Sequence, residues 1–81
     1  MFYLYVLKSI QFGTYYIGSC KDLQIRLRQH NRGKVKSTKF RKPWELVHSE
    51  RFMTLSKARS RELELKSLKK RIALERLIKH F

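Results

Sequence analysis

The hydrophobic positions along the chain predict three strands. Residues 2–7 are apolar or aromatic at every position, which is typical of a strand buried on both faces. A short turn ending at Gly13 leads into a second run at 14–19, and so short a connection predicts an antiparallel pair. A third strand is predicted at 44–52, where Pro43 suits the start of a strand or a sheet edge.

Three helices are predicted from apolar positions spaced three and four residues apart. The first begins after Asp22 as N-cap, runs to about Asn31 and stops at Gly33. The second begins after Thr54 or Ser56 and reaches about residue 67. The third, near the C-terminus, has an apolar stripe made of Leu74, Leu77, Ile78 and Phe81. The order ββαβαα predicts an α+β fold with a small three-stranded antiparallel sheet flanked by helices.

Length and charge narrow the class of protein. A chain of 81 residues is expected to form one domain, residues 1–81. Its 20 lysines and arginines oppose only 6 acidic residues, a net charge of +14. Such a domain repels itself unless it works against a polyanion, with nucleic acid the first candidate and an anionic membrane the second. We predict that nucleic acid is contacted by the basic loop residues Lys34, Lys36, Lys39, Arg41 and Lys42.

Cysteine content and hydropathy bear on the compartment. The single cysteine, Cys20, excludes an internal disulfide and a multi-cysteine zinc site, and it suits a reducing compartment such as the cytoplasm. No cleavable signal pattern opens the chain, and no apolar run approaches the roughly 20 residues of a spanning helix. The C-terminal helix is basic and amphipathic, but its apolar face is needed for the core, so we expect no membrane partner.

Residue types suited to phosphate chemistry are concentrated between residues 14 and 30. Tyr16 lies on the second strand, and Arg26 and His30 lie one turn apart on the first helix. Each also has an ordinary explanation: Tyr5 and Tyr16 as core aromatics, Arg26 as a surface charge, and His30 as a hydrogen-bonded histidine near a helix end. Whether the two tyrosines share a face depends on the strand register, which the sequence leaves open.

Glu62 lies inside the apolar stripe of the second helix, between Leu55 and Ala58 in projection. Burying an unpaired carboxylate is costly, so the position calls for a metal ion or a strong cationic partner. A salt bridge to a neighbouring arginine, or a side chain that bends out at the edge of the stripe, would also explain it.

The ordered series of motifs resembles the GIY-YIG nuclease family. The series comprises Tyr3-Leu4-Tyr5, Tyr16-Ile17-Gly18, Arg26 and His30 on a helix, and Glu62 on a later helix. It is most similar to the short stand-alone branch, which is itself similar to the N-terminal nuclease module of the UvrC repair protein. Tyr3 stands where the name-giving glycine would be, and the asparagine that some members carry late in the domain has no counterpart.

The resemblance implies a metal-dependent endonuclease that hydrolyses DNA phosphodiester bonds, in DNA repair or recombination. By motif position, Tyr5, Tyr16, Arg26 and His30 would be catalytic, and Glu62 would bind Mg²⁺ or Mn²⁺. Arg26 would clamp the scissile phosphate, one tyrosine would accept the proton of the attacking water, and His30 would orient that water or exchange protons. A protein partner or a second copy would add specificity. The alternative is a non-catalytic basic module that binds nucleic acid with the same fold.

Overall fold

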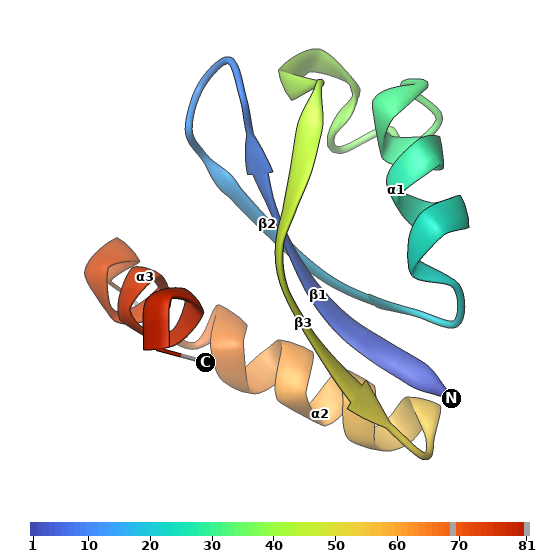
Figure 1. The fold of residues 1–81 in the computed structure, drawn as a ribbon, viewed down its shortest axis with the longest axis vertical. Helices are drawn as coiled ribbons and strands as arrows, with labels where there is room; N and C mark the ends of the chain where they lie inside the picture. Colours follow the sequence, from blue (N-terminus) through green and yellow to red (C-terminus); the bar gives the residue numbers. More distant parts are fainter. Residues whose placement is uncertain (69, 81) are drawn as a thin grey trace.

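The computed structural model describes residues 1–68 and 70–80, and its elements follow the predicted order (Figure 1). The α+β class and the order ββαβαα are confirmed. Phe81, predicted on the third apolar stripe, lies outside the described residues. The elements are β1 Phe2–Ser9, β2 Tyr15–Cys20, α1 Leu23–Asn31, the 3-10 turn η1 Lys39–Arg41, β3 Trp44–Phe52, α2 Leu55–Lys66 and α3 Arg71–His80.

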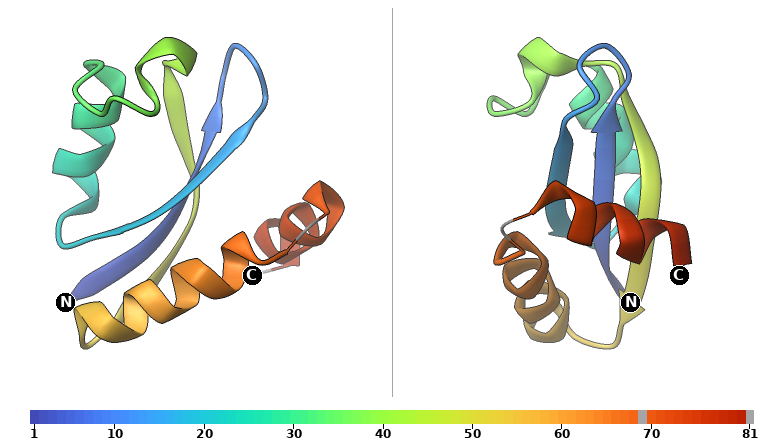
Figure 2. Two further views of the ribbon diagram at one scale, coloured as in Figure 1. Left: turned by 180° about the vertical axis from the view of Figure 1, so that it is seen from behind. Right: turned by 90° about the vertical axis from the view of Figure 1, so that its left-hand side faces the viewer.

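The three strands form one antiparallel sheet in the order β2-β1-β3, so β1 is central. Leu4 and Val6 of β1 pack on one side of the sheet with residues of α2 and α3. Tyr5 and Leu7 pack on the other side with residues of α1. Helices therefore cover both faces (Figures 1 and 2), which explains why β1 is apolar or aromatic from Phe2 to Leu7.

Local sequence accounts for the helix ends. The Asp22 side chain accepts a hydrogen bond of 3.0 Å from the backbone N–H of Ile25 and so caps α1. Gly33 follows α1 with a φ of 74°, the left-handed conformation that glycine adopts without strain. Thr54, rather than Ser56, caps α2, because its hydroxyl accepts from the backbone N–H of Lys57. None of the described helices is long and apolar enough to cross a membrane.

The strand register settles which residues share a face. Leu7 of β1 lies opposite Tyr16 of β2, and Tyr5 lies opposite Gly18. Because directly opposed residues project to the same side of a sheet, both tyrosines face α1. Their ring centroids are 6.3 Å apart. The fold therefore brings together two phenols that lie on separate strands.

Candidate active site

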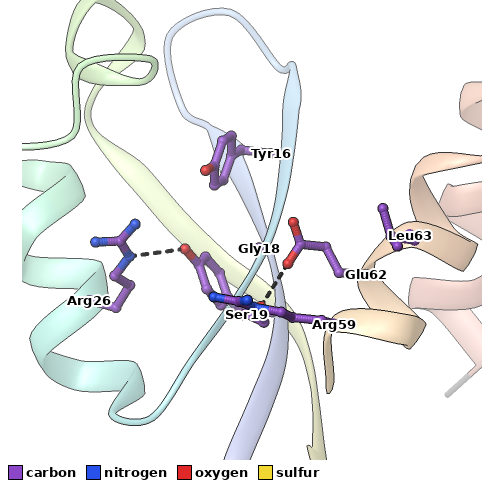
Figure 3. A pocket seen from close by; sticks show the side chains of 8 residues that line it. Tyr16, Gly18, Ser19, Arg26, Arg59, Glu62 and Leu63 are labelled. Atoms are coloured by element: carbon purple, nitrogen blue, oxygen red, sulfur yellow. Dashed lines mark hydrogen bonds between the residues drawn. The ribbon is translucent and has the colours of Figure 1, made fainter. Parts of the chain in front are cut away.

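A pocket of about 380 Å³ opens at the β2 edge of the sheet, between α1 and α2. Figure 3 shows Arg26 reaching toward it from α1 and Glu62 from α2, with Gly18 and Ser19 of β2 between them. The sequence-predicted residues Tyr5, Tyr16, Arg26 and Glu62 thus share one cavity, although they come from four elements. Its lining consists of Tyr5, Tyr16, Gly18, Ser19, Arg26, Arg59, Glu62 and Leu63.

Gly18 gives Tyr5 its route to the pocket. Tyr5 belongs to the central strand and is only 2% exposed, so its phenol must cross the neighbouring strand to reach the edge. A Cβ at position 18 would lie 2.6 Å from the Tyr5 hydroxyl oxygen and 2.7 Å from Cζ. No side chain larger than hydrogen fits beneath the ring, which is the physical reason for glycine at this point of the motif.

The Tyr5 hydroxyl is held by two partners. It lies 3.0 Å from Nε2 of His30, and it accepts a hydrogen bond of 3.3 Å from Nε of Arg26. Burial raises the pKa of Tyr5 to about 12, although the Arg26 charge and hydrogen bond act in the opposite direction. The phenol is therefore protonated at neutral pH, and it needs an acceptor for its own proton before it can take one from water.

His30 lies behind the tyrosines and does not line the pocket. Its side chain is fully buried, and its ring centroid lies 5.8 Å from that of Tyr5 and 5.1 Å from that of Tyr16. Burial, with the nearby Arg26 charge, lowers the pKa of His30 to about 4, so the ring is neutral at pH 7. This geometry rules out direct contact with a water in the pocket. Proton exchange with Tyr5 is within reach.

The Tyr16 side chain lines the same pocket, but its surroundings differ from those of Tyr5. It is half-buried, and its ring stands 6.3 Å, edge to face, from that of Trp44. Its hydroxyl makes no hydrogen bond to the other lining residues (Figure 3). Tyr16 can therefore offer its hydroxyl to a water or a phosphate without breaking a bond within the pocket wall.

Glu62 is held by a hydroxyl and an ammonium group. Its Oε1 accepts a hydrogen bond of 2.7 Å from the Ser19 hydroxyl, and its Oε2 pairs with Nζ of Lys66 at 2.6 Å. Partial burial raises the pKa of Glu62, but the hydrogen bonds from Lys66 and Ser19 outweigh it, and the pKa lies below its usual value. The carboxylate is ionised, and its salt-bridge partner is a lysine rather than an arginine.

The donor set fits a hydrated magnesium or manganese ion. Among the described residues, no group of three histidines, cysteines or carboxylates converges as a zinc or calcium site would require. One ionised carboxylate, 19% exposed and at the wall of an open pocket, instead matches the way Mg²⁺ binds through one or two carboxylates while keeping several waters. Glu62 would hold the ion, provided that it releases Lys66 or shares its remaining lone pairs.

Three residues near the site were not identified from the sequence. Arg59 lines the pocket one turn before Glu62, and its i, i+3 spacing from the glutamate was an available signal. Ser19 follows the glycine of the second tyrosine motif. Thr38, beside His30, carried no local signal because it lies in a loop.

The predicted basic residues lie apart from this cavity. All five are exposed, and none lines the pocket. They belong to the segment between α1 and β3, which sits beside the end of α1 (Figure 1). They are Lys34, Lys36, Lys39, Arg41 and Lys42.

Known proteins share both sequence and fold with this chain. The sequence model of the GIY-YIG catalytic domain matches residues 1–77. A UPF0213 protein of Staphylococcus aureus is 41% identical over 78 residues, which cover 95% of this chain and 93% of that protein. A UPF0213 protein of Staphylococcus saprophyticus is 39% identical over 74 residues, covering 90% and 89%. The solution NMR structure of a UPF0213 protein from Bacillus halodurans is similar with a TM-score of 0.61 and 33% identity, covering 98% of this chain and 84% of that chain.

Proposed function

The chain belongs to the GIY-YIG catalytic-domain family, and from this premise we propose that it is a divalent-metal-dependent endonuclease that hydrolyses DNA phosphodiester bonds. One observation carries the proposal: two phenols, two guanidinium groups and an ionised carboxylate line a single open pocket. Phosphodiester cleavage needs a proton acceptor for water, positive charge for the phosphate and help for the leaving oxyanion. The lining of this pocket contains a group for each task.

Arg26 and Arg59 are the phosphate-binding groups in this proposal. They line the same pocket from α1 and α2, so they can contact a phosphate from two sides. Arg26 is held at its Nε by the bond to Tyr5, and its Nη1 donates to the Gln29 amide oxygen at 3.1 Å. A guanidinium fixed in this way stabilises a developing negative charge with little reorganisation.

Tyr5 is the proton acceptor that the hydrogen bonds favour. As the water oxygen bonds to phosphorus, the water's proton passes to the Tyr5 oxygen and the phenolic proton moves to Nε2 of His30, 3.0 Å away. The P–O bond to the leaving group then breaks. A phosphate anion on Arg26 would offset the charge that lowers the pKa of His30, which makes the imidazole a better acceptor when substrate is bound.

Glu62 is the proposed metal ligand. A bound Mg²⁺ or Mn²⁺ would act as a Lewis acid that neutralises charge on the phosphate and the leaving oxygen. The chain's own contribution is to keep the carboxylate ionised and aimed at the pocket. The Ser19 hydroxyl orients the carboxylate, and the Lys66 ammonium keeps it ionised while occupying the oxygen that a metal ion would take.

The wider surface supports DNA as the substrate. The whole chain has a net charge of +14, and the loop before β3 carries exposed cations. These cations would neutralise backbone phosphates and give salt-sensitive binding with little dependence on base sequence. The likeness of the motifs to the UvrC nuclease module supports a role in DNA repair or recombination. A reducing location, which we take to be the cytoplasm, suits the free thiol of Cys20. A second copy or a protein partner would supply cleavage specificity.

A plasmid-nicking assay tests the proposal. Supercoiled DNA is incubated with wild-type protein in Mg²⁺, in Mn²⁺ and in EDTA, and Glu62→Gln is compared with Glu64→Gln. Glu64 lies on the same helix but is exposed and paired with Arg61, so it is a matched control. We expect metal-dependent nicking by the wild type and by Glu64→Gln, and loss of at least roughly 100-fold in Glu62→Gln.

Two results would contradict the proposal. If the wild type binds DNA but does not nick it with any divalent metal, the alternative applies, a non-catalytic nucleic-acid-binding module. If Glu62→Gln nicks as fast as Glu64→Gln, the carboxylate is not the metal ligand. A filter-binding measurement in EDTA on each variant separates lost binding from lost chemistry.

A further inference from the structure

We infer that Thr38 is a positioning residue that holds His30 in the tautomer protonated on Nδ1, leaving Nε2 to accept the Tyr5 proton. Thr38 is only 1% exposed. Its hydroxyl oxygen lies 2.8 Å from Nδ1 of His30 and 3.3 Å from the carbonyl oxygen of Val35, to which it donates. The catalytic consequence of this inference rests on the proposed function, but the tautomer itself does not.

The hydrogen-bond inventory gives the direction of the proton. A threonine hydroxyl has one proton, and its contact with the Val35 carbonyl at 3.3 Å has the geometry of a donated hydrogen bond. With that proton on the Val35 side, the hydroxyl accepts from His30, and in the inferred tautomer Nδ1 carries the hydrogen. A neutral imidazole has one N–H, so Nε2 presents its lone pair to Tyr5.

The backbone of Thr38 is fixed well enough to impose this choice. Its N–H donates to the Val35 carbonyl at 3.0 Å. Its carbonyl oxygen accepts from the indole N–H of Trp44 at 3.0 Å and from the N–H of Arg41 at 3.1 Å. Because its backbone N–H and carbonyl are both hydrogen-bonded, Thr38 can hold its hydroxyl in place and so orient His30. Residues that hydrogen-bond to metal-binding histidines orient them in the same way.

The opposite tautomer would block Tyr5. With a proton on Nε2, His30 would donate to the Tyr5 oxygen, which already accepts from Arg26. Both lone pairs of the phenol would then be occupied, and none would remain for the proton of a pocket water. The Thr38 hydroxyl thus decides whether Tyr5 can act as a base.

The test replaces Thr38 by Val and by Ser, with Ser37→Ala as the exposed neighbouring control. Long-range ¹H–¹⁵N NMR of the protein without substrate reports which ring nitrogen of His30 is protonated. We expect Nδ1–H in the wild type, Thr38→Ser and Ser37→Ala, and a shift toward Nε2–H in Thr38→Val. Nicking should fall by roughly 10–100-fold in Thr38→Val and recover in Thr38→Ser.

The outcomes separate this inference from the proposed function. A wild-type His30 protonated on Nε2 overturns the inference, whether or not the protein cleaves DNA. So does a Thr38→Val protein that keeps Nδ1–H and nicks normally. If the wild type never nicks DNA, the proposed function fails, yet the NMR signals still decide the tautomer.

A different observation supports a second inference: we propose that the end of the molecule formed by the β1–β2 hairpin tip and η1 binds unpaired nucleobases of single-stranded nucleic acid. Three large apolar side chains are exposed there, Ile10 by 63%, Phe12 by 56% and Phe40 by 82%. The two segments lie at the same end of the molecule in each view (Figures 1 and 2).

Hydrogen bonds tie the two segments together. The buried Ser9 hydroxyl donates to the Arg41 carbonyl oxygen at 2.6 Å and accepts from the N–H of Phe12 at 3.1 Å. The N–H of Ile10 donates to the Pro43 carbonyl oxygen at 3.0 Å. The hairpin tip and the loop therefore form one connected surface, because their backbones are joined by hydrogen bonds.

The chemistry of this end fits single-stranded nucleic acid. Nζ of Lys39 lies 4.9 Å from the Phe40 ring centroid, and Arg41 and Lys42 are exposed beside it. Cations that follow the backbone, combined with aromatic rings on which bases stack, characterise single-strand binding surfaces. Duplex DNA buries its base faces in the stack, so the rings would distinguish unpaired strands from paired ones.

Binding without metal tests this surface apart from any nuclease activity. Phe40→Ala is compared with Met53→Ala, which removes a 72% exposed apolar side chain near the start of α2. Fluorescence anisotropy in EDTA measures affinity for an oligothymidine strand and for a duplex of equal length at one salt concentration. We expect Phe40→Ala to weaken single-strand binding roughly 5–100-fold, with duplex binding and Met53→Ala unchanged. Equal loss on both DNAs, or no loss, would overturn the inference.

Discussion

Replacing His30 by Gln should remove a pH dependence of stability that the fold builds in. The pKa of His30 falls from 6.5 to about 4 on folding, because burial and the Arg26 charge disfavour the imidazolium. Below pH 6.5 His30 is protonated in the unfolded chain but stays neutral in the folded chain. The free energy of unfolding therefore decreases as the pH is lowered from 6.5 to about 4. Each unit of difference between the unfolded and folded pKa of His30 corresponds to about 1.4 kcal/mol. The free energy of unfolding should therefore decrease by about 3 kcal/mol between about pH 7 and pH 4.

Urea unfolding followed by circular dichroism between pH 4 and pH 7 would measure the effect. The carboxylates lose their native interactions in the same range, so the difference between wild type and variant isolates the histidine. Glutamine cannot titrate but can still donate and accept hydrogen bonds toward Tyr5 and Thr38. Arg28→Gln, exposed on the same helix, should keep the wild-type slope.

If His30→Gln and wild type lose stability in parallel as the pH falls, His30 is not kept neutral by the fold. Tyr5 would then have no neutral imidazole to accept its proton. A difference of about 3 kcal/mol is a large share of the 5–15 kcal/mol typical of a small domain, so it is well within measurement.

Three further predictions follow from distances within the site and from the surface charge. Gly18→Ala should abolish nicking, because the new Cβ would lie 2.6 Å from the Tyr5 hydroxyl and displace it; unchanged activity in the nicking assay would contradict this packing. Lys66→Met should strengthen Mg²⁺ binding in a calorimetric titration, because it frees an oxygen of Glu62 that the ammonium holds at 2.6 Å; weaker binding would show that the lysine supports the site instead. Lys36→Gln should lower the slope of log affinity for duplex DNA against log salt by up to about 0.9, and an unaltered slope would remove this lysine from the interface.

Much of the fold could be predicted because its signals are local. The continuous apolar run of β1, the cap at Asp22 and the glycine after α1 each depend on residues within one or two turns. The predicted span of β3, residues 44–52, agrees with Trp44–Phe52 in the structure. The ambiguous start of α2 shows the limit, because Thr54 and Ser56 are both competent caps.

The family resemblance is confirmed by the match over residues 1–77, but the environment of each motif residue was not predictable. His30 was expected on α1, one turn from Arg26 and near the helix end, and the structure shows that it is fully buried. The position of Glu62 called for a metal ion or a cationic partner, and the structure pairs its carboxylate with Lys66, one turn further along the same helix. The roles of these residues stay predictions until the variants described above are measured.

The sequence by itself determined the order of the elements, the positive charge and the set of residue types available for phosphate chemistry. Those properties follow from composition and from periodicity over a few residues. Only the tertiary structure decided that Tyr5 bonds to His30, 25 positions away, and that Ser19 bonds to Glu62, 43 positions away. Such contacts depend on strand register and on the packing of helices against both sheet faces, which no short stretch of sequence specifies. The tautomer of His30 and the pKa values of the buried groups depend on that packing.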